Sequence, residues 1–284
     1  MPKTITISNN TLTASISTMG AELISLKKGD TEYMWDANPD VWAGHAPILF
    51  PVCGRLKDGK YIYGGKEYFM GAHGFAKNSL FTLESADSTC AVFLLKANEE
   101  TKKMYPFDFE FRSVFTLCEN SLNIEFQVKN TDNKAIYFSV GSHEAYACPE
   151  GIEEYSLIFD QTENLENSLL DGPLLNHKTD KSFGDAAELP LKYSYFDVDT
   201  LIFNKLKSRA VTLKNRRTER QVRVTFEGID HLMIWTKQGA NYLCIEPWCG
   251  LPDYVDSDYD FIKKPGIISL DIGQEFKKSH SVIL

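Results

Sequence analysis

The chain has 284 residues, of which 43% are hydrophobic and 24% are charged, so it is long enough to bury a large core without disulfide or metal staples. Its formal net charge is −9, which argues against a nucleic-acid-binding protein because such proteins usually present a basic field. The six cysteines form no Cys-x-x-Cys pair, and the start of the chain lacks a basic segment followed by an apolar one. No apolar run is long enough to span a bilayer. We therefore expect a cytoplasmic protein with reduced thiols and no membrane partner.

Alternation of apolar and polar residues runs through most of the chain and predicts many short β-strands. Gly64-Gly65 stands between two such segments and is a strong hairpin signal. The predicted strands cover residues 4–7, 12–16, 20–26, 32–35, 61–63, 66–69, 80–85, 91–97, 108–117, 121–130, 136–141, 154–159, 200–203, 210–214, 221–226, 231–235, 241–246, 267–270 and 279–284.

Helical periodicity is scarce. Residues 38–43, 97–105 and 180–188 are predicted to form short helices, and the polar stretch 160–181 to be a long surface excursion. Strands and helices do not alternate, which disfavours a parallel α/β fold. Because the strands are linked by short turns and no repeat or linker divides the chain, we expect an all-β fold, one large antiparallel β-sandwich domain over residues 1–284 with few short helices.

Motifs for phosphate-binding loops, zinc sites and serine hydrolases are absent from the sequence. Asp253, Asp256, Asp258 and Asp260 form an acidic cluster that could hold a hard cation. The cluster lacks the glycine turn and terminal glutamate of the calcium-binding loop, which favours a solvated loop. The sequence therefore predicts neither a metal site nor a cofactor.

Four segments place chemically active side chains where strands end or glycines let the backbone turn. Arg55 follows an apolar run, His73 lies between two glycines, His143 follows the strand YFSVG, and Glu246 ends the apolar strand YLCI. Each of these residues also has a purely structural interpretation: in the same order, a surface arginine, a structural histidine, a core histidine and an ion-paired strand end. A carboxylate at the end of an apolar strand is costly to bury without a partner and is frequently functional.

Together these segments resemble the aldose 1-epimerase, or galactose mutarotase, superfamily, and they look closest to its branch of small bacterial LacX-like proteins. ILFPVCGRL, HGFA, YFSVGSHEA, DTLIF and CIEPWCG follow one another in the family's order, and the resemblance covers about residues 10 to 275. It implies a β-sandwich of the galactose mutarotase-like (supersandwich) type. It also implies an isomerase that interconverts the α and β anomers of a hexose by acid–base ring opening and closure, without metal or cofactor.

The resemblance assigns roles by position in the motifs. His143 matches the general acid that protonates the ring oxygen, and Glu246 matches the general base that takes the proton of the anomeric hydroxyl. His73 matches a second histidine that polarises the sugar, and Arg55 matches an arginine that reaches a sugar hydroxyl or the ring oxygen. Asp199 matches the aspartate that anchors a distal hydroxyl, although Asp197 lies only two residues away.

Two positions depart from the family's pattern. Lys77 follows HGFA where branch members commonly have arginine, which keeps the charge but loses the planar fork. Glu144 follows His143 at a position where they commonly have proline, and a carboxylate facing His143 would favour the protonated imidazole. Trp248, together with Trp42 and Tyr146, is a candidate for the flat apolar platform that sugars need.

Two other functions stay open at this point. A hexose-6-phosphate 1-epimerase of the same superfamily would need extra cations, to which Arg55 and Lys77 could contribute. A non-catalytic carbohydrate-binding β-sandwich is disfavoured because both histidines, Arg55 and Glu246 are present. In each case the expected partner is a small-molecule sugar, and the protein is expected to be a monomer or a homodimer.

Overall fold

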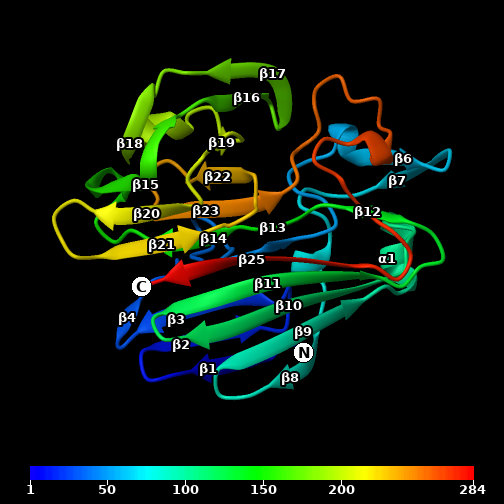
Figure 1. Ribbon diagram of the computed structural model, residues 1–284, viewed down its shortest axis with the longest axis horizontal. Helices are drawn as coiled ribbons and strands as arrows, with labels where there is room; N and C mark the ends of the chain where they lie inside the picture. Colours follow the sequence, from blue (N-terminus) through cyan, green and yellow to red (C-terminus); the bar gives the residue numbers. More distant parts are fainter.

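The computed structural model describes residues 1–284 and confirms an all-β fold built from antiparallel sheets (Figure 1). The largest sheet has nine strands in the order β18-β15-β20-β21-β25-β11-β10-β9-β8. The last strand of the chain, β25, lies between β21 and β11, so the C-terminal segment joins the two halves of this sheet. Its strands are β8 (Thr82–Ala86), β9 (Cys90–Lys96), β10 (Phe109–Cys118), β11 (Ser121–Asn130), β15 (Tyr155–Asn164), β18 (Asp185–Pro190), β20 (Ala210–Asn215), β21 (Gln221–Thr225) and β25 (Glu275–Ile283).

The second large sheet has eight strands and lies in the upper half of the view in Figure 1. Its order is β17-β16-β19-β22-β23-β13-β5, and β14 pairs with β23 next to β13. Its strands are β5 (Ile48–Leu49), β13 (Val140–Ser142), β14 (Glu144–Ala147), β16 (Asn167–Asp171), β17 (Leu174–Asp180), β19 (Leu201–Phe203), β22 (His231–Trp235) and β23 (Tyr242–Cys249).

Smaller elements complete the structure. One sheet contains β1 (Thr4–Ser8), β2 (Leu12–Ser17), β3 (Glu22–Lys28) and β4 (Thr31–Glu32); two pairs are β6 (Lys60–Tyr63) with β7 (Lys66–Phe69) and β12 (Ile136–Phe138) with β24 (Ile268–Leu270). The one α-helix is α1 (Glu99–Met104), which Asn98 caps. The 3-10 turns are η1 (Lys57–Gly59), η2 (Ala76–Asn78), η3 (Ile152–Glu154), η4 (Tyr193–Phe196) and η5 (Phe261–Lys263). No helix is both long and apolar enough to cross a membrane.

A phenylalanine-rich core explains why the loop after β5 is held firmly. The core is a cluster of 62 buried residues that runs from Ile7 to Leu284. Strand β10 supplies it with Phe109, Phe111, Phe115 and Leu117 from its buried face, as period-two alternation requires. The Phe50 ring stacks on Phe111 at a centroid distance of 4.5 Å and is fully buried. The loop that carries Arg55 is therefore anchored in the core directly before it reaches the surface.

The structure corrects three sequence predictions. The helix predicted over residues 97–105 is confirmed as α1, but residues 38–43 form no helix, and the segment predicted as a helix over 180–188 contains strand β18. The predicted excursion over 160–181 is also wrong, because β15 continues to Asn164 and β16 and β17 form a hairpin. Strand β17 is the edge of its sheet, and all of its residues except Leu175 are exposed or partly buried, so its polar composition did not indicate a strand.

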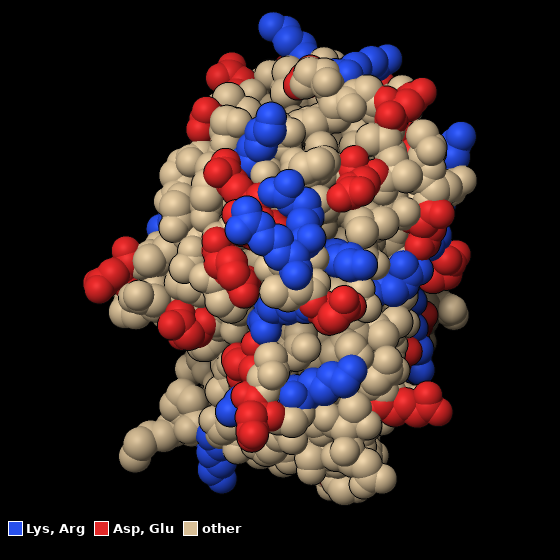
Figure 2. Space-filling view, turned by 90° about the vertical axis from the view of Figure 1, so that its left-hand side faces the viewer, with Lys and Arg blue, Asp and Glu red and all other residues tan.

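The face that carries the turn between β20 and β21 shows lysine and arginine interspersed with aspartate and glutamate (Figure 2). Arg217 in this turn pairs with Glu154 at 2.9 Å. Arg220 donates to the carbonyl of Glu32 at 2.7 Å, and its guanidinium lies over the ring of Tyr33. These two arginines therefore tie the turn to the body of the protein.

Candidate active site

A cavity of about 390 Å³ opens at the eight-stranded sheet, within the range of small-molecule sites. All of the predicted site residues line it except Lys77 and the platform candidate Tyr146. The complete lining is Trp42, Gly54, Arg55, His73, His143, Leu170, Pro173, Asp199, Thr200, Trp235, Lys237, Glu246, Trp248 and Pro252.

Strand β23 carries one wall of the cavity. Residues two apart on a strand share a face, so Glu246 and Trp248 point to the same side. Trp248 pairs in register with Gly141 of β13, where a Cβ atom would lie 2.8 Å from the indole ring. Glycine therefore lets the indole pack closely, and its Nε1 donates to the carbonyl of Ser142 at 3.0 Å. This contact fixes the backbone immediately before His143.

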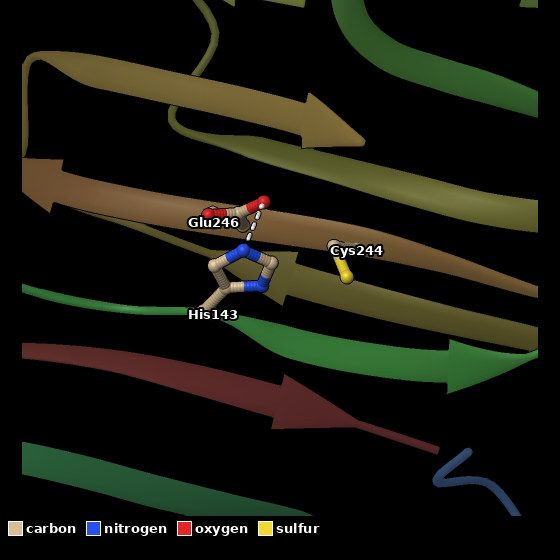
Figure 3. A group of neighbouring side chains, drawn as sticks. All are labelled: His143, Cys244 and Glu246. Carbon is tan, nitrogen blue, oxygen red and sulfur yellow. Dashed lines mark ion pairs between the residues drawn. The ribbon is translucent and has the colours of Figure 1, made fainter. Parts of the chain in front are cut away.

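His143 and Glu246 meet inside the cavity, with Nε2 of the imidazole 3.4 Å from Oε1 of the carboxyl group (Figure 3). Their side chains are 13% and 2% exposed. Nδ1 of His143 and Oε2 of Glu246 have no hydrogen-bond partner. Burial lowers the pKa of His143 from 6.5 to about 3. Burial, followed by the negative charges of Glu144 and Asp199, raises the pKa of Glu246 well above its usual range. The empty site therefore favours a neutral imidazole and a protonated carboxyl group.

Cys244 lies beside this pair, and the three side chains have donor atoms within 4.8 Å of one another. Imidazole, thiolate and carboxylate are all zinc ligands. In Figure 3 the sulfur lies to one side of the imidazole ring, whereas the Glu246 carboxyl group lies beside Nε2. Burial also raises the pKa of the Cys244 thiol well above its usual range. A metal site here would need this thiol to ionise, so we interpret the group as a histidine–carboxyl pair beside a buried thiol.

His73 is held by the backbone on both sides. Its own φ is +64°, and its N–H donates to the carbonyl of Gly54 at 2.8 Å. The Gly54 N–H in turn donates to Nδ1 of His73 at 3.3 Å. A Cβ atom on Gly74 would clash with the Phe50 carbonyl, so this turn requires glycine. Burial, with the charge of neighbouring His143, lowers the pKa of His73 well below its usual range. Because Nδ1 accepts a hydrogen bond, the ring proton of the neutral imidazole lies on Nε2.

Aromatic rings form the apolar part of the site. Trp42 stacks on His143 at a centroid distance of 5.1 Å, and Trp235 meets the same ring edge-on at 5.6 Å. Trp248 lies edge-on to His73 at 5.5 Å. Tyr146 is fully buried and does not line the cavity, which removes it from the candidate platform. Trp235 was missed in the sequence because only the pairing of β22 with β23 brings it to this wall.

Charged side chains also line the cavity. Arg55, Asp199 and the unanticipated Lys237 are among them. Asp199 has a φ of +91°, and burial raises its pKa. Asp197 is exposed and accepts a hydrogen bond from Gln238, so of the two aspartates it is Asp199 that faces the cavity.

Lys77 does not line this cavity and instead lines a neighbouring one, together with Gly74 and Phe75. It is half-buried, and burial together with the charge of Arg55 lowers its pKa. Its positive charge contributes to the low pKa of both His73 and His143. Its effect on the site is therefore electrostatic.

Glu144 does not face His143, contrary to the arrangement considered from the sequence. Its Oε1 lies 2.9 Å from Nε2 of His280 on β25, and both side chains are buried. Neighbouring residues of a strand point to opposite faces, which places Glu144 on the core side of the strand. Its charge therefore does not hold a proton on His143 and instead raises the pKa of Glu246.

The carboxylates of the acidic loop after β23 contact separate basic side chains. Asp253 pairs with buried Lys264 at 3.0 Å, whereas Asp256 pairs with His177 at 2.8 Å. The backbone N–H of Asp253 also donates to the carbonyl of Arg55 at 2.9 Å. The loop thus supports the backbone of Arg55, and its carboxylates do not converge on one point.

A family model described as aldose 1-epimerase matches residues 3–282. The chain belongs to the aldose 1-epimerase family. Protein LacX, encoded on a plasmid of Lactococcus lactis subsp. lactis, is 35% identical over 296 aligned positions that cover 99% of this chain and 99% of the relative.

Two solved structures share the fold of this aldose 1-epimerase family member. A galactose mutarotase related enzyme from Lactobacillus acidophilus has a TM-score of 0.93 and 36% identity and covers 99% of this chain and 97% of its own. A galactose mutarotase-like protein from Lactobacillus casei ATCC 334 has a TM-score of 0.93 and 27% identity and covers 99% of each chain. The galactose mutarotase-like fold and the LacX-like resemblance read from the sequence are confirmed.

Proposed function

We propose that this protein is an aldose 1-epimerase that interconverts the α and β anomers of an unphosphorylated hexose. The observation that carries the proposal is the buried pair of His143 Nε2 and Glu246 Oε1, 3.4 Å apart in a cavity that His73 and Arg55 also line. Membership of the aldose 1-epimerase family supports an isomerase acting on carbohydrates.

The chemistry needs two proton transfers of opposite sense. A base removes the proton of the anomeric hydroxyl while an acid protonates the ring oxygen, and the bond between the anomeric carbon and the ring oxygen breaks. The open-chain aldehyde rotates about one carbon–carbon bond and recloses from the other face. In our proposal Glu246 is the base and His143 the acid, and each transfer contributes about 10²–10⁴-fold to the rate. Reclosure reverses the two roles.

The pair must be charged before the first transfer, because burial in the empty site keeps the proton on Glu246. A sugar hydroxyl that donates to the unpartnered Oε2 of Glu246 would stabilise the carboxylate and lower its pKa. The carboxylate would then favour a proton on His143, 3.4 Å away. Substrate binding thus converts the neutral pair into the acid–base pair that ring opening uses.

The other lining residues suit a neutral sugar. Nε2–H of His73 and the Arg55 guanidinium can donate to sugar oxygens, and Asp199 can accept from a hydroxyl. Lys237 adds a cation, but its Nζ already bonds to the carbonyl of Val41. The Asp199 carboxylate in the lining disfavours a phosphate dianion, which favours an unphosphorylated hexose over a hexose 6-phosphate.

Polarimetry tests the proposal. Freshly dissolved α-D-glucose and α-D-galactose are followed with the wild type, His143→Ala, Glu246→Ala and the exposed control His177→Ala. We expect the control to match the wild type and the two site variants to lose about 10²–10⁴-fold. Equal rates for all four proteins would reject the roles. Faster turnover of glucose 6-phosphate, with inhibition by inorganic phosphate, would identify the phosphorylated substrate, and sugar binding without catalysis would identify a binding protein.

A further inference from the structure

A second histidine and carboxyl group lie behind the acid–base pair and join the two large sheets. Glu144 begins β14 in the eight-stranded sheet, and His280 lies on β25 in the nine-stranded sheet. Their side chains are 3% and 0% exposed, and Oε1 of Glu144 is 2.9 Å from Nε2 of His280. Polar groups buried this deeply are costly unless they bond to each other, so the contact fixes where β14 sits against β25.

The same imidazole contacts both residues that flank His143. Nε2 of His280 lies 3.3 Å from Oγ of Ser142 as well as 2.9 Å from Glu144. The Ser142 carbonyl accepts the bond from Nε1 of Trp248 at 3.0 Å. The backbone before and after His143 is therefore held from the core side at two adjacent positions.

The titratable groups around Glu144 come from three strands. Tyr146 lies on β14, Cys244 and Glu246 lie on β23, and His280 lies on β25. After burial, the Glu144 charge is the next cause that raises the pKa of Tyr146 and of Glu246, and it also raises that of the Cys244 thiol. Glu144 therefore acts electrostatically on the carboxyl group assigned as the base.

We propose that Glu144 and His280 are positioning residues for the epimerase reaction, which hold the backbone on both sides of His143 and keep a negative charge behind Glu246. This inference rests on the proposed function. A nearby negative charge makes a carboxylate a stronger base, because it favours the proton-bound form. His280 keeps that charge in place through its contact with the Glu144 carboxyl oxygen.

The decisive variant is Glu144→Gln, which keeps the shape of the side chain but removes its charge. Its matched control is Glu163→Gln, because Glu163 is equally buried and its carboxylate accepts hydrogen bonds from the N–H groups of Lys207 and Ser208, outside the cavity. The pH dependence of kcat/KM for the hexose is measured for both variants and the wild type. For Glu144→Gln we expect kcat to fall about tenfold or more at unchanged KM. We also expect its acid limb to move down by about one pH unit.

The control is expected to keep the wild-type profile even if its stability falls. The inference is overturned if Glu144→Gln and Glu163→Gln have the same kcat and the same acid limb. If Glu144→Gln does not fold, the same measurement is made on His280→Gln, which keeps a hydrogen-bond donor for Glu144. A reduced kcat at unchanged KM then supports the inference, and a wild-type kcat overturns it.

An NMR measurement separates this inference from the proposed function. A wild-type protein without mutarotation would reject the proposed function. The imidazole resonance of His143 would then decide the present inference without any turnover. It should shift in Glu144→Gln, or in His280→Gln if that variant replaces it, and keep its position in Glu163→Gln. An unchanged resonance in the test variant would overturn the positioning role.

Discussion

Replacing His143 by glutamine should change how the stability of the protein depends on pH. Burial lowers the pKa of the folded imidazole from 6.5 to about 3. Below pH 6.5 the imidazole of His143 therefore binds a proton in the unfolded chain but stays neutral in the folded protein. The protein therefore loses stability as the pH falls from 6.5 towards 3. Each pH unit in this window corresponds to about 1.4 kcal/mol, which gives a loss of about 2 kcal/mol between pH 6.5 and about pH 5.

Urea denaturation of the wild type and His143→Gln at a series of pH values measures this effect. The quantity of interest is the difference between the two free energies of unfolding, because the other titratable groups occur in both proteins and largely cancel. We expect this difference to move against the wild type by about 2 kcal/mol between about pH 7 and pH 5. His177→Gln, which alters an exposed histidine, should leave the slope close to that of the wild type.

The opposite result would refute the account of burial. If the difference stays constant, or if the wild type gains stability on acidification relative to His143→Gln, then the folded imidazole binds its proton as well as the unfolded one. That outcome would mean that an imidazolium–carboxylate pair with Glu246 exists in the empty site and that the neutral pair does not.

Three further predictions concern backbone, core and rate. Gly74→Ala, at φ +70° and against a backbone carbonyl, should lower the free energy of unfolding by about 3 kcal/mol or more, whereas Gly64→Ala, which faces open space, should lower it by about 1 kcal/mol. Urea denaturation measures both losses, and equal losses would contradict the predicted clash at Gly74. Lys264→Met should destabilise the protein by about 3–5 kcal/mol because it leaves Asp253 buried without its cation, and adding Asp253→Asn should recover part of that stability. A double variant less stable than Lys264→Met would contradict this prediction. Since burial raises the pKa of Glu246 above 4.5, kcat/KM should fall on the acid side with an apparent pKa above 4.5, and a limb below that value would contradict the assignment.

Local patterns predicted the strands wherever one face of the strand is buried. Residues 121–130 were predicted with the bounds of β11, since alternate apolar side chains mark its core face. Residues 231–235 were predicted with the bounds of β22, whose three central residues form a short apolar run that is buried throughout. Gly64-Gly65 was a sound hairpin signal because both residues have positive φ, as a two-residue turn between strands requires. The prediction for residues 160–181 was wrong because the edge strand β17 has only one fully buried residue, Leu175, and so lacks that alternation.

The site was predictable only in part, because local sequence patterns do not show which strands pair. His143 and Glu246 stand in recognisable motifs, but Trp235 and Lys237 reach the cavity through the pairing and end of β22, which no local pattern shows. The direction of Glu144 was available from the sequence, because adjacent residues of a strand point to opposite faces. Its partner His280 lies 136 positions away and could not be found from spacing.

Mutarotation rates of the wild type, His143→Gln, Glu246→Gln and the double variant test most directly whether the two side chains form one acid–base pair. They can be measured by exchange between the two anomeric proton signals of the hexose in NMR. Groups that act as a unit lose about as much singly as together. We predict that each single variant is as slow as the double variant. Losses that multiply in the double variant, or a single variant as fast as the wild type, would contradict the pair.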